Sequence, residues 1–552
     1  MVDQAMTYSL LSVAMAAMSS VLSAGSAPGD TCESWAMTGD IRTAPGEAAE
    51  AVLISGERVT AVGDASLADA LPAECVVALP EGAVALPGLH DGHAHLLGVG
   101  LREMTLNLEG TTSIAELQTR IKSAAAELDK CETLYGRGWI ETGWPEGRMP
   151  TAADLDKVVK DRPVILVRAD GHAMVVNTMA LKRAGITKDT ADPEGGRVER
   201  DEKGKATGLL IDMAMPLVDD LLPKLDEDRR REGLKVGAEK MASLGWTGVH
   251  NMSVNPEDVV ILKEMSAAGE LPVRVFNYLV PGALDQVIEQ GTGCTDDDMV
   301  CTNGIKFYVD GALGSRGALL FHDYADQPGK RGLQLMQKED AVEAFQKAYE
   351  NKVQVTTHAI GDKGNFLVLD WYKRVLGELD ATERKAPRWR IEHAQIVRPN
   401  DIPRFAFYGI TPSMQPSHAI GDLFFAPARL GEQRLLGAYA WGRFFENGAN
   451  VVGGSDAPVE KGDPRIEIFA ATKRKALDGT QGENWHPEEA VTEEQAIAMF
   501  TTNAAYAVFK EDRLGRLAEG FYADISVFSG DPFETDWNAT NALMTVVGGK
   551  VR

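Results

Sequence analysis

The sequence predicts an α/β protein, a (β/α)8 TIM-like barrel with an insertion after its first strand and a small β-sandwich domain built from both termini. Three observations lead to this prediction. Strand-like apolar stretches alternate with amphipathic helical stretches through the middle of the chain. Short β-segments separated by turns lie at both ends. Histidine, lysine and aspartate stand where the barrel strands are expected to end.

The barrel is expected between about residues 83 and 504. Helical patterns such as 229–244 and 338–351 separate most of its strand-like stretches. Eight strand–helix alternations favour a closed barrel over a doubly wound sheet. The gap of about 97–240 after the first strand is too long for one helix and predicts the insertion. The candidate strands are 83–89, 246–251, 273–279, 304–309, 353–358, 389–393, 409–415 and 450–455.

Residues 28–82 and 505–552 are expected to form the small β-domain together. In the first segment, residues 51–62 hold two apolar runs on either side of a Gly-Glu turn, which is the pattern of a hairpin. The second segment has similar apolar runs at 523–528 and 542–552. The two ends would therefore meet in one domain beside the barrel.

The chain has 552 residues, 44% of them hydrophobic, and a formal net charge of −25. This acidic balance argues against nucleic acid and anionic membranes as partners. Residues 10–22 are apolar but too short to span a bilayer, so no stable membrane insertion is expected. Although no basic residue precedes Arg42, the small residues at 23–27 favour a signal peptide over 1–27 and export to the periplasm or beyond. Without a signal the protein would be cytoplasmic, and assembly into a homodimer is left open.

The chain contains five cysteines, and none forms a CxxC pair. Cys294 and Cys301 bracket a short acidic loop and could close a disulfide, and Cys32 and Cys75 could form another. Cys131 would then be left over. Disulfides are expected only if the protein is exported.

His93 and His95 lie two residues apart at the end of the first candidate strand. Side chains at this spacing point to the same side of extended backbone, so the two imidazoles can chelate one divalent metal ion. Other strand ends supply further ligands, because barrel chemistry sits at the C-terminal ends of the strands. They are Lys306, His358, His393 and Asp456. This donor set suits Zn²⁺ or a similar ion.

Lys306 and Asp456 each admit two interpretations. Burial in an apolar strand lowers the pKa of a lysine, and a neutral Lys306 could react with CO₂ to give a carbamate that bridges two metals. Alternatively, Lys306 could pair with Asp310. Asp456 could be a turn residue after Gly454, or it could bind metal and act as general base on an activated water.

The chain resembles the amidohydrolase superfamily, and specifically the amidohydrolase 3 group, which includes YtcJ-like proteins and N-substituted formamide deformylases. The likeness runs from about residue 36 to 552 and is specific in order and spacing. Its main stretches are 86–95 (LPGLHDGHAH), 170–173 (DGHA), 309–316 (VDGALGSR), 358–362 (HAIGD), 391–395 (IEHAQ), 415–418 (QPSH) and 454–458 (GSDAP).

The resemblance implies two divalent ions, expected to be zinc. One would bind His93, His95 and Asp456, and the other would bind His358 and His393. A carboxylated Lys306 would bridge them, although some members of the family hold a single metal.

Five further residues are candidates for substrate contact, and all but Arg316 have a structural alternative. His172 resembles a substrate-contacting position of the family, but it could be a loop histidine held by backbone groups. Arg316 could hold a carboxylate or carbonyl. Trp139 could line the pocket, as could Trp144, or both could be core aromatics. His418 could touch substrate or pack a loop. His90 receives no role, and His250, His322 and His486 are expected to be structural.

These features predict a metal-dependent hydrolase of non-peptide carbon–nitrogen bonds, acting on a small-molecule amide or N-substituted formamide. An activated water would attack the carbonyl, and Asp456 would carry its proton to the departing nitrogen. Two alternatives remain. One is a lactone, ester or carbamate hydrolase using the same site, and the other is a non-catalytic, metal-holding regulatory protein.

Overall fold

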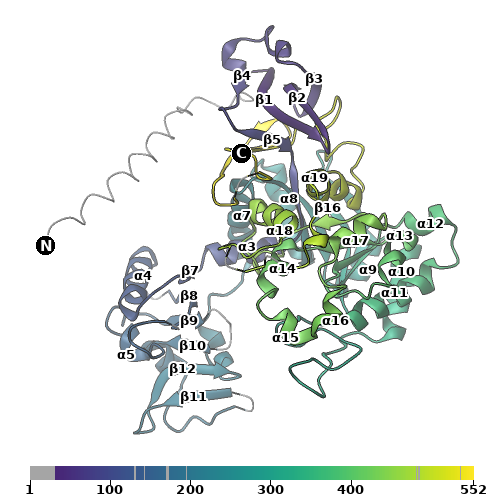
Figure 1. Cartoon of the computed structure of the whole chain (residues 1–552). Helices are drawn as coiled ribbons and strands as arrows, with labels where there is room; N and C mark the ends of the chain where they lie inside the picture. Colours follow the sequence, from purple (N-terminus) through teal and green to yellow (C-terminus); the bar gives the residue numbers. More distant parts are fainter. Residues whose placement is uncertain are drawn as a thin grey trace. The chain divides into compact units, whose positions relative to one another are not determined.

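The computed structural model describes residues 32–129, 132–141, 143–168, 173–193, 196–479, 481–482, 485–534 and 536–552 (Figure 1). The expected signal segment 1–27, Cys131 and His172 lie outside these residues. The chain divides into two compact units. The first takes in the described residues up to His95 and Ala238–Arg552, and the second is Leu96–Gly237.

The first unit contains the predicted barrel. Neighbouring barrel strands pair in parallel, and a parallel bridge between Ala94 of β6 and Ala457, just after β20, closes the ring. Two hydrogen bonds close it, from Asp456 N–H to the His93 carbonyl (2.7 Å) and from His95 N–H to the Ala457 carbonyl (2.8 Å). The strands are β6 (Leu89–Ala94), β13 (Trp246–Val254), β14 (Arg274–Leu279), β16 (Val300–Tyr308), β17 (Gln354–Ala359), β18 (Arg390–His393), β19 (Thr411–Met414) and β20 (Val452–Gly453).

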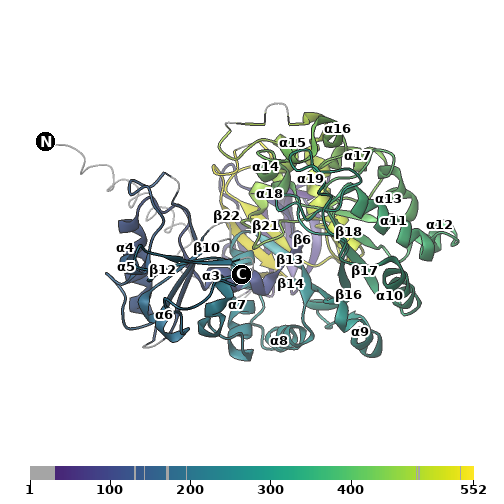
Figure 2. The same ribbon diagram turned by 90° about the horizontal axis from the view of Figure 1, so that it is seen from below.

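Amphipathic helices surround these strands (Figure 2). In α10 (Lys338–Glu350), the buried residues Ala341, Phe345 and Ala348 recur every three to four positions and form one apolar stripe. The other helices of this layer include α8 (Pro256–Ala267), α9 (Leu284–Gln290), α11 (Asp362–Leu376), α13 (Ile402–Tyr408), α17 (Trp441–Glu446), α18 (Pro464–Lys473), α19 (Glu493–Phe500) and α20 (Thr502–Ala507). Each strand is therefore buried on both faces, as parallel barrel strands require.

The first candidate strand, 83–89, proves to be two elements. β5 (Val84–Pro87) belongs to the terminal sheet, and the barrel strand β6 begins at Leu89. The chain changes sheets at Gly88, whose N–H donates to the Asp524 carbonyl at 2.7 Å. A Cβ atom at Gly88 would lie 2.3 Å from Thr247 Oγ1, so only glycine fits this crossing.

The two ends of the chain form one sheet of eight strands. The expected hairpin is present as β2 (Glu47–Ser55) and β3 (Arg58–Gly63), joined through Gly56 and Glu57, with Gly56 at φ 53°. β5 pairs antiparallel with β21, which brings the C-terminal segment beside the N-terminal one. The remaining strands are β1 (Ser34–Ala44), β4 (Val76–Ala78), β21 (Ile525–Phe528), β22 (Ala542–Val547) and β23 (Lys550–Val551).

Two disulfides form in this unit, Cys32–Cys75 and Cys294–Cys301. These are the two pairings that the sequence suggested. The second joins β15 (Gly293–Cys294) to β16, where the two cysteines are direct partners in the ladder. Asp298 lies beside them, but this group cannot supply two thiolates to a metal because the sulfurs are bonded to each other.

The second unit has its own sheet, in the order β11-β12-β10-β9-β8-β7, and its own apolar core. Its strands are β7 (Leu106–Asn107), β8 (Leu134–Trp139), β9 (Val164–Arg168), β10 (Ala173–Val176), β11 (Gly196–Arg200) and β12 (Ala206–Asp212). Its helices are α3 (Leu96–Glu103), α4 (Ile114–Glu127), α5 (Ala152–Leu155) and α6 (Thr178–Arg183), and α7 (Glu227–Ser243) leads back to the first unit. Among the described residues, no helix has both the length and the apolar character to cross a bilayer.

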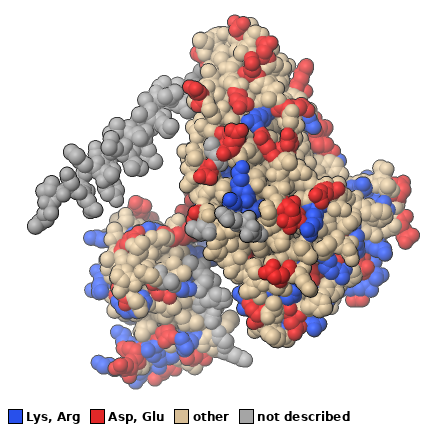
Figure 3. All heavy atoms as spheres, in the orientation of Figure 1, with Lys and Arg blue, Asp and Glu red and all other residues tan. Residues whose placement is uncertain are grey.

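Over the visible face of the first unit, basic and acidic side chains are interspersed (Figure 3). Interspersed charges of both signs give a weaker local field than a cluster of one sign.

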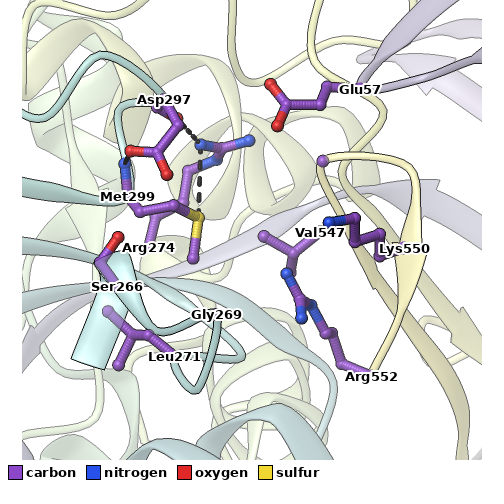
Figure 4. Close-up of a pocket in the computed structure, with 11 residues that line it drawn as sticks. Glu57, Ser266, Gly269, Leu271, Arg274, Asp297, Met299, Val547, Lys550 and Arg552 are labelled. Atoms are coloured by element: carbon purple, nitrogen blue, oxygen red, sulfur yellow. Dashed lines mark hydrogen bonds between the residues drawn. The ribbon is translucent and has the colours of Figure 1, made fainter. Parts of the chain in front are cut away.

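A buried ion pair joins the barrel to the terminal sheet. Arg274 on β14 donates to the Asp524 carboxylate at 2.7 and 3.0 Å, and the two side chains are 1% and 4% exposed. The third guanidinium nitrogen donates to the Asp297 carbonyl (2.6 Å) and to Met299 Sδ (3.7 Å), as Figure 4 shows. The guanidinium carbon of Arg274 also lies over the Tyr522 ring, 3.9 Å from the ring centre.

We expect Asp524→Ala to lower the free energy of unfolding by about 3–5 kcal/mol, because it leaves the Arg274 guanidinium buried without its counter-charge. The matched control is Asp285→Ala, which breaks an exposed pair with Lys347 and should cost less than about 1 kcal/mol. Equilibrium urea denaturation followed by circular dichroism measures both. Equal losses in the two variants would contradict a special role for the buried pair.

Candidate metal centre

The barrel brings the predicted ligands together at one end. His93 is the penultimate residue of β6, His358 lies on β17, His393 ends β18, and Asp456 follows β20. The ring centres of His93 and His393 are 4.8 Å apart, and those of His358 and His393 are 4.5 Å apart. His95 follows β6, and its ring centre is 5.5 Å from that of His93. One ligand atom each from His93, His393 and Asp456 lies within 4.8 Å of the others.

Two of these residues have unusual backbone conformations. His393 has φ 72° and Asp456 has φ 59°, both in the left-handed region that disfavours residues other than glycine. The Asp456 N–H bond to the His93 carbonyl, which closes the barrel, also helps to hold Asp456 in this conformation. Residues in such conformations cluster at functional sites, where the surrounding structure offsets their cost.

Hydrogen bonds fix the tautomer of three histidines. Nδ1 of His93 lies 2.6 Å from Glu392 Oε2, and Nδ1 of His95 lies 3.0 Å from the Met252 carbonyl. Nδ1 of His393 lies 2.7 Å from Gln415 Oε1. Carboxylate and carbonyl oxygens only accept, so each Nδ1 carries the proton and each Nε2 of the neutral ring carries a lone pair.

These lone pairs face the carboxylate of Asp456. Its Oδ1 lies 3.2 Å from His95 Nε2 and 3.4 Å from His93 Nε2. Nε2 of His93 and Nε2 of His358 are buried without a hydrogen-bond partner among the described residues. A lone pair opposite a carboxylate oxygen is unfavourable unless a cation or a proton lies between them. The donor set therefore fits a divalent metal ion, which imidazole and carboxylate bind together.

The protonation states agree with this arrangement. Burial, aided by the charge of nearby Lys306, lowers the pKa of His93 to about 4 and that of His358 to about 3. Both rings are therefore neutral near pH 7, the form that binds metal. Burial alone would raise the pKa of Asp456, but positive charge at the positions of His93, His95 and His393 holds it well below its usual range. Because His93 and His393 are neutral near pH 7, a bound divalent cation would supply this charge. Asp456 is therefore ionised.

Lys306 lies on β16 inside the barrel and is 1% exposed. Burial lowers the pKa of its amine to about 8. No described carboxylate lies within 4.0 Å of its Nζ, which is 5.1 Å from the centre of the Tyr308 ring. Asp310 is not its partner. The Asp310 carboxylate instead accepts the backbone N–H groups of Leu319 (2.8 Å), Ile360 (3.0 Å) and Gly361 (2.8 Å).

His418 also reaches the cluster. It lies on α14 (Pro416–Asp422), and its ring stacks on that of His393 with ring centres 5.8 Å apart. Its Nε2 is 3.7 Å from Asp456 Oδ2. This nitrogen has no hydrogen-bond partner among the described residues. Asp456 is therefore flanked by His93 and His95 at one oxygen and by His418 at the other.

The other candidate substrate contacts have different surroundings. Arg316 donates to Asp326 at 3.1 and 2.8 Å, and Arg429 also pairs with Asp326, so a local ion-pair cluster engages the guanidinium. Trp139 and Trp144 belong to the core of the second unit. Their indole N–H groups donate to the carbonyls of Leu166 (3.0 Å) and Thr111 (2.7 Å), which accounts for both as core aromatics.

Sequence reasoning missed the group that holds His93. Glu392 is fully buried and accepts from Arg390 Nη2 at 3.3 Å, from the Thr356 hydroxyl and from His93. Its Oε1 also lies 2.8 Å from Arg390 Nε in an ion pair. Burial would raise the pKa of Glu392, but Arg390 and His93 hold it well below its usual range. The available signal was the pair of charged residues at alternate positions of a short strand, Arg390 and Glu392, on either side of Ile391.

The histidines that were expected to be structural include one that supports this group. Nδ1 of His250 lies 2.9 Å from Arg390 Nη1, beneath the cluster. His90, which received no role, is buried and stacks on Phe276 with ring centres 5.5 Å apart.

Comparisons with known proteins point to one family. The amidohydrolase family model matches residues 80–552. YtcJ of Bacillus subtilis (strain 168), an amidohydrolase by name, is 34% identical over 481 residues, 85% of this chain and 89% of YtcJ. N-substituted formamide deformylase of Arthrobacter pascens is 26% identical over 488 residues, 85% of this chain and 88% of that protein.

A solved structure has a similar fold over most of the chain. The crystal structure of an uncharacterized metal-dependent hydrolase from Pyrococcus furiosus has a TM-score of 0.74 and 29% identity, and the match covers 91% of this chain and all of that one. The match to the family model extends over the barrel strands and the C-terminal sheet strands alike. We conclude that this chain belongs to the amidohydrolase family and is a metal-dependent hydrolase.

Proposed function

We propose that this protein hydrolyses a carbon–nitrogen bond of a small-molecule amide or N-substituted formamide. One observation carries the proposal: the ionised Asp456 faces fixed imidazole lone pairs at a buried site that suits a divalent cation. The likeness to a formamide deformylase supports the choice of bond.

Two zinc ions are the proposed cofactors. His93, His95 and Asp456 would hold one, and His358 and His393 the other. A divalent ion bound there polarises the substrate carbonyl and lowers the pKa of a water molecule. The clustering of all four rings, and the partnerless Nε2 atoms of His93 and His358, support this assignment.

Lys306 is proposed to bridge the two ions as a carbamate. Its amine nitrogen would form a bond to the carbon of CO₂ and release one proton to solvent, which leaves an anionic carboxylate on the side chain. The burial of Lys306 and the absence of a described carboxylate within 4.0 Å of its Nζ support this, because no direct ion pair ties up the amine.

Asp456 is proposed to be the general base and then the general acid. It would take the proton of the attacking water and deliver it to the departing nitrogen. Oδ2 is the oxygen placed for this transfer, because Oδ1 is the one that His93 and His95 face. The lowered pKa of Asp456 keeps it in the base form near pH 7.

Glu392 is proposed to position His93 through its Nδ1–H. A carboxylate behind a metal-binding histidine fixes the tautomer and makes the ring a better ligand. Arg390 and Thr356 hold Glu392 in turn.

Two other functions remain testable at the same site. A lactone, ester or carbamate hydrolase would use the same ligands and the same base. A metal-holding regulatory protein would bind zinc without turnover. A substrate panel that pairs formamides and amides with esters and lactones distinguishes these from the proposed reaction.

For Lys306→Ala we expect zinc content to fall from about two equivalents per chain to one or fewer, because the bridging anion is lost. Elemental analysis of protein purified without chelators measures this. Lys347→Ala, which removes a half-exposed lysine, is the control. Incubation with ¹³C-bicarbonate should give a carbamate ¹³C signal that the Lys306 variant lacks. Unchanged zinc content would contradict the bridge.

Asp456→Asn should reduce kcat by about 10²–10⁴-fold, because the amide cannot accept the proton of the attacking water. Circular dichroism should show the fold intact. Asp323→Asn, an aspartate that pairs with Arg331 on the surface, is the matched control and should keep full activity. Turnover retained by Asp456→Asn would rule out Asp456 as the base.

Glu392→Gln should weaken zinc binding by about 10–100-fold, because His93 loses its anionic partner. Competition with a chromogenic chelator measures the zinc Kd of wild type and variant. A thermal melt of the zinc-free proteins separates this effect from simple loss of stability. Loss of stability with an unchanged zinc Kd would assign Glu392 to the fold alone.

A further inference from the structure

We infer that Tyr308 donates a hydrogen bond to the substrate's carbonyl oxygen, and to the oxyanion that develops there when water adds, and that Ser253 positions it. This rests on the proposed function and adds a catalytic residue to it. The two side chains come from β16 and β13, and a hydrogen bond joins their hydroxyls. We call them the hydroxyl pair.

Tyr308 borders the metal centre. It is the last residue of β16 and lies two positions after Lys306, so both side chains point to the same side of the strand. The centre of the Tyr308 ring is 5.8 Å from that of the His358 ring and 5.1 Å from Lys306 Nζ. Lys306 is fully buried, whereas Tyr308 is only partly buried. Part of Tyr308 is therefore open to solvent, and to a substrate, beside the candidate ligands.

The backbone at Ser253 is shaped so that its hydroxyl meets Tyr308. The ladder between β13 and β14 shifts register between Met252 and Val254, which makes Ser253 the extra residue of a β-bulge. Ser253 has φ 61°, in the left-handed region that favours glycine. Bulges re-aim side chains, and residues in such conformations cluster at functional sites. The Ser253 hydroxyl thus reaches past β14 to Tyr308 on β16.

The same stretch of β13 also serves a candidate ligand. The carbonyl of Met252, next to Ser253 in the chain, accepts from His95 Nδ1 at 3.0 Å. One short segment therefore orients a metal-binding ring and holds the Tyr308 hydroxyl, which fixes the two relative to each other. Burial raises the pKa of Tyr308, and the negative charge of Asp456 acts in the same direction, so the proposed base is also near.

Two hydroxyls joined by one hydrogen bond have one proton left to donate. Each O–H donates once, and the bond between Ser253 and Tyr308 uses one of the two protons. Neither hydroxyl has another hydrogen-bond partner among the described residues. When Ser253 donates to the phenol oxygen, the O–H of Tyr308 is left for a ligand, and the bond from Ser253 makes it a stronger donor.

A carbonyl oxygen that becomes negative is the ligand that such a donor stabilises most. In the proposed reaction, water adds to the carbonyl carbon as Asp456 takes its proton, and the carbonyl electron pair moves onto oxygen. This oxyanion accepts the hydrogen bond from Tyr308. When the carbon–nitrogen bond breaks, the electron pair returns to re-form the carbonyl, and the nitrogen takes the proton from Asp456. Tyr308 keeps its own proton throughout.

Tyr308→Phe should lower kcat for para-nitroformanilide by about 10²–10³-fold with little change in KM, because the donor acts mainly in the transition state. Ser253→Ala should cost only about tenfold, because Tyr308 keeps its O–H. The double variant should lose no more than Tyr308→Phe alone. Release of para-nitroaniline measures all three. The matched control is Tyr349→Phe, at a half-buried tyrosine of α10 whose ring packs against Trp389, and it should keep full activity.

Replacing the carbonyl oxygen with sulfur separates a donor from a structural role. Sulfur is a weak hydrogen-bond acceptor, so it gains little from the Tyr308 O–H. The ratio of kcat/KM for para-nitroformanilide to that for its thioformyl analogue should therefore fall about tenfold in Tyr308→Phe. A substitution that only disturbs the structure slows both substrates alike and leaves the ratio unchanged.

An unchanged oxygen-to-sulfur ratio in Tyr308→Phe overturns the donor assignment, whatever the loss of kcat, and leaves the hydroxyl pair as a link between strands. The hydrolase function then still stands. If wild type hydrolyses no amide or formamide, the proposed function fails instead. The donor is then judged by calorimetric binding of methylphosphonate, a tetrahedral anion, to zinc-loaded wild type and Tyr308→Phe. A Kd about tenfold weaker in the variant supports it, and equal Kd values overturn it.

Discussion

Imidazole lone pairs that face a carboxylate repel it unless a cation lies between them, and the interior of this barrel is arranged around that constraint. Each Nδ1 of His93, His95 and His393 is committed to an oxygen acceptor, so no ring can relieve the repulsion by exchanging tautomers. Protonation of the ring could also relieve the repulsion, but burial lowers the pKa of His93 to about 4, so the ring stays neutral near pH 7. The protein therefore holds an electron-rich site that only a cation satisfies.

The supporting shell explains how such an unfavourable arrangement persists. Arg390 compensates the charge of Glu392 beneath the cluster, and the hydrogen bonds that close the barrel hold Asp456 in its left-handed conformation. Neighbouring strands thus supply both the candidate ligands and the groups that hydrogen-bond to them, such as Glu392 beside His93. α14 also contributes to the cluster, because His418 Nε2 lies 3.7 Å from Asp456 Oδ2. Other residues of the same helix line a small, mostly apolar pocket.

Much of this could be predicted from the sequence because the signals are local. The strand expected at 304–309 lies largely within β16, and that at 246–251 within β13, because each is a short apolar run bounded by turns. The candidate ligands could be predicted from their places at strand ends. What could not be predicted depends on contacts between distant segments. Glu392 reaches His93 across 299 residues, and no local pattern reveals that pairing.

Two other differences have the same origin. Residues 83–89 form a continuous apolar run, yet the packing of Gly88 against Thr247 and Asp524 divides it between two sheets. Trp139 and Trp144 are the kind of residue that lines pockets, but their indole N–H groups find carbonyls inside the second unit. In both cases the sequence shows that the residues are apolar and suited to burial. Which sheet or core they join depends on contacts with distant parts of the chain.

The crossing at Gly88 also has a consequence for how the site is held. β5 leads directly into the strand that carries His93, and it pairs with β21 near the C-terminus. At the start of β6, Leu89 N–H donates to Ser526 Oγ, 437 residues away in sequence. The segment that carries the candidate ligands His93 and His95 therefore depends on the C-terminal strands for its final register. A chain shortened by its last strands would lose this anchor of the segment that carries His93 and His95.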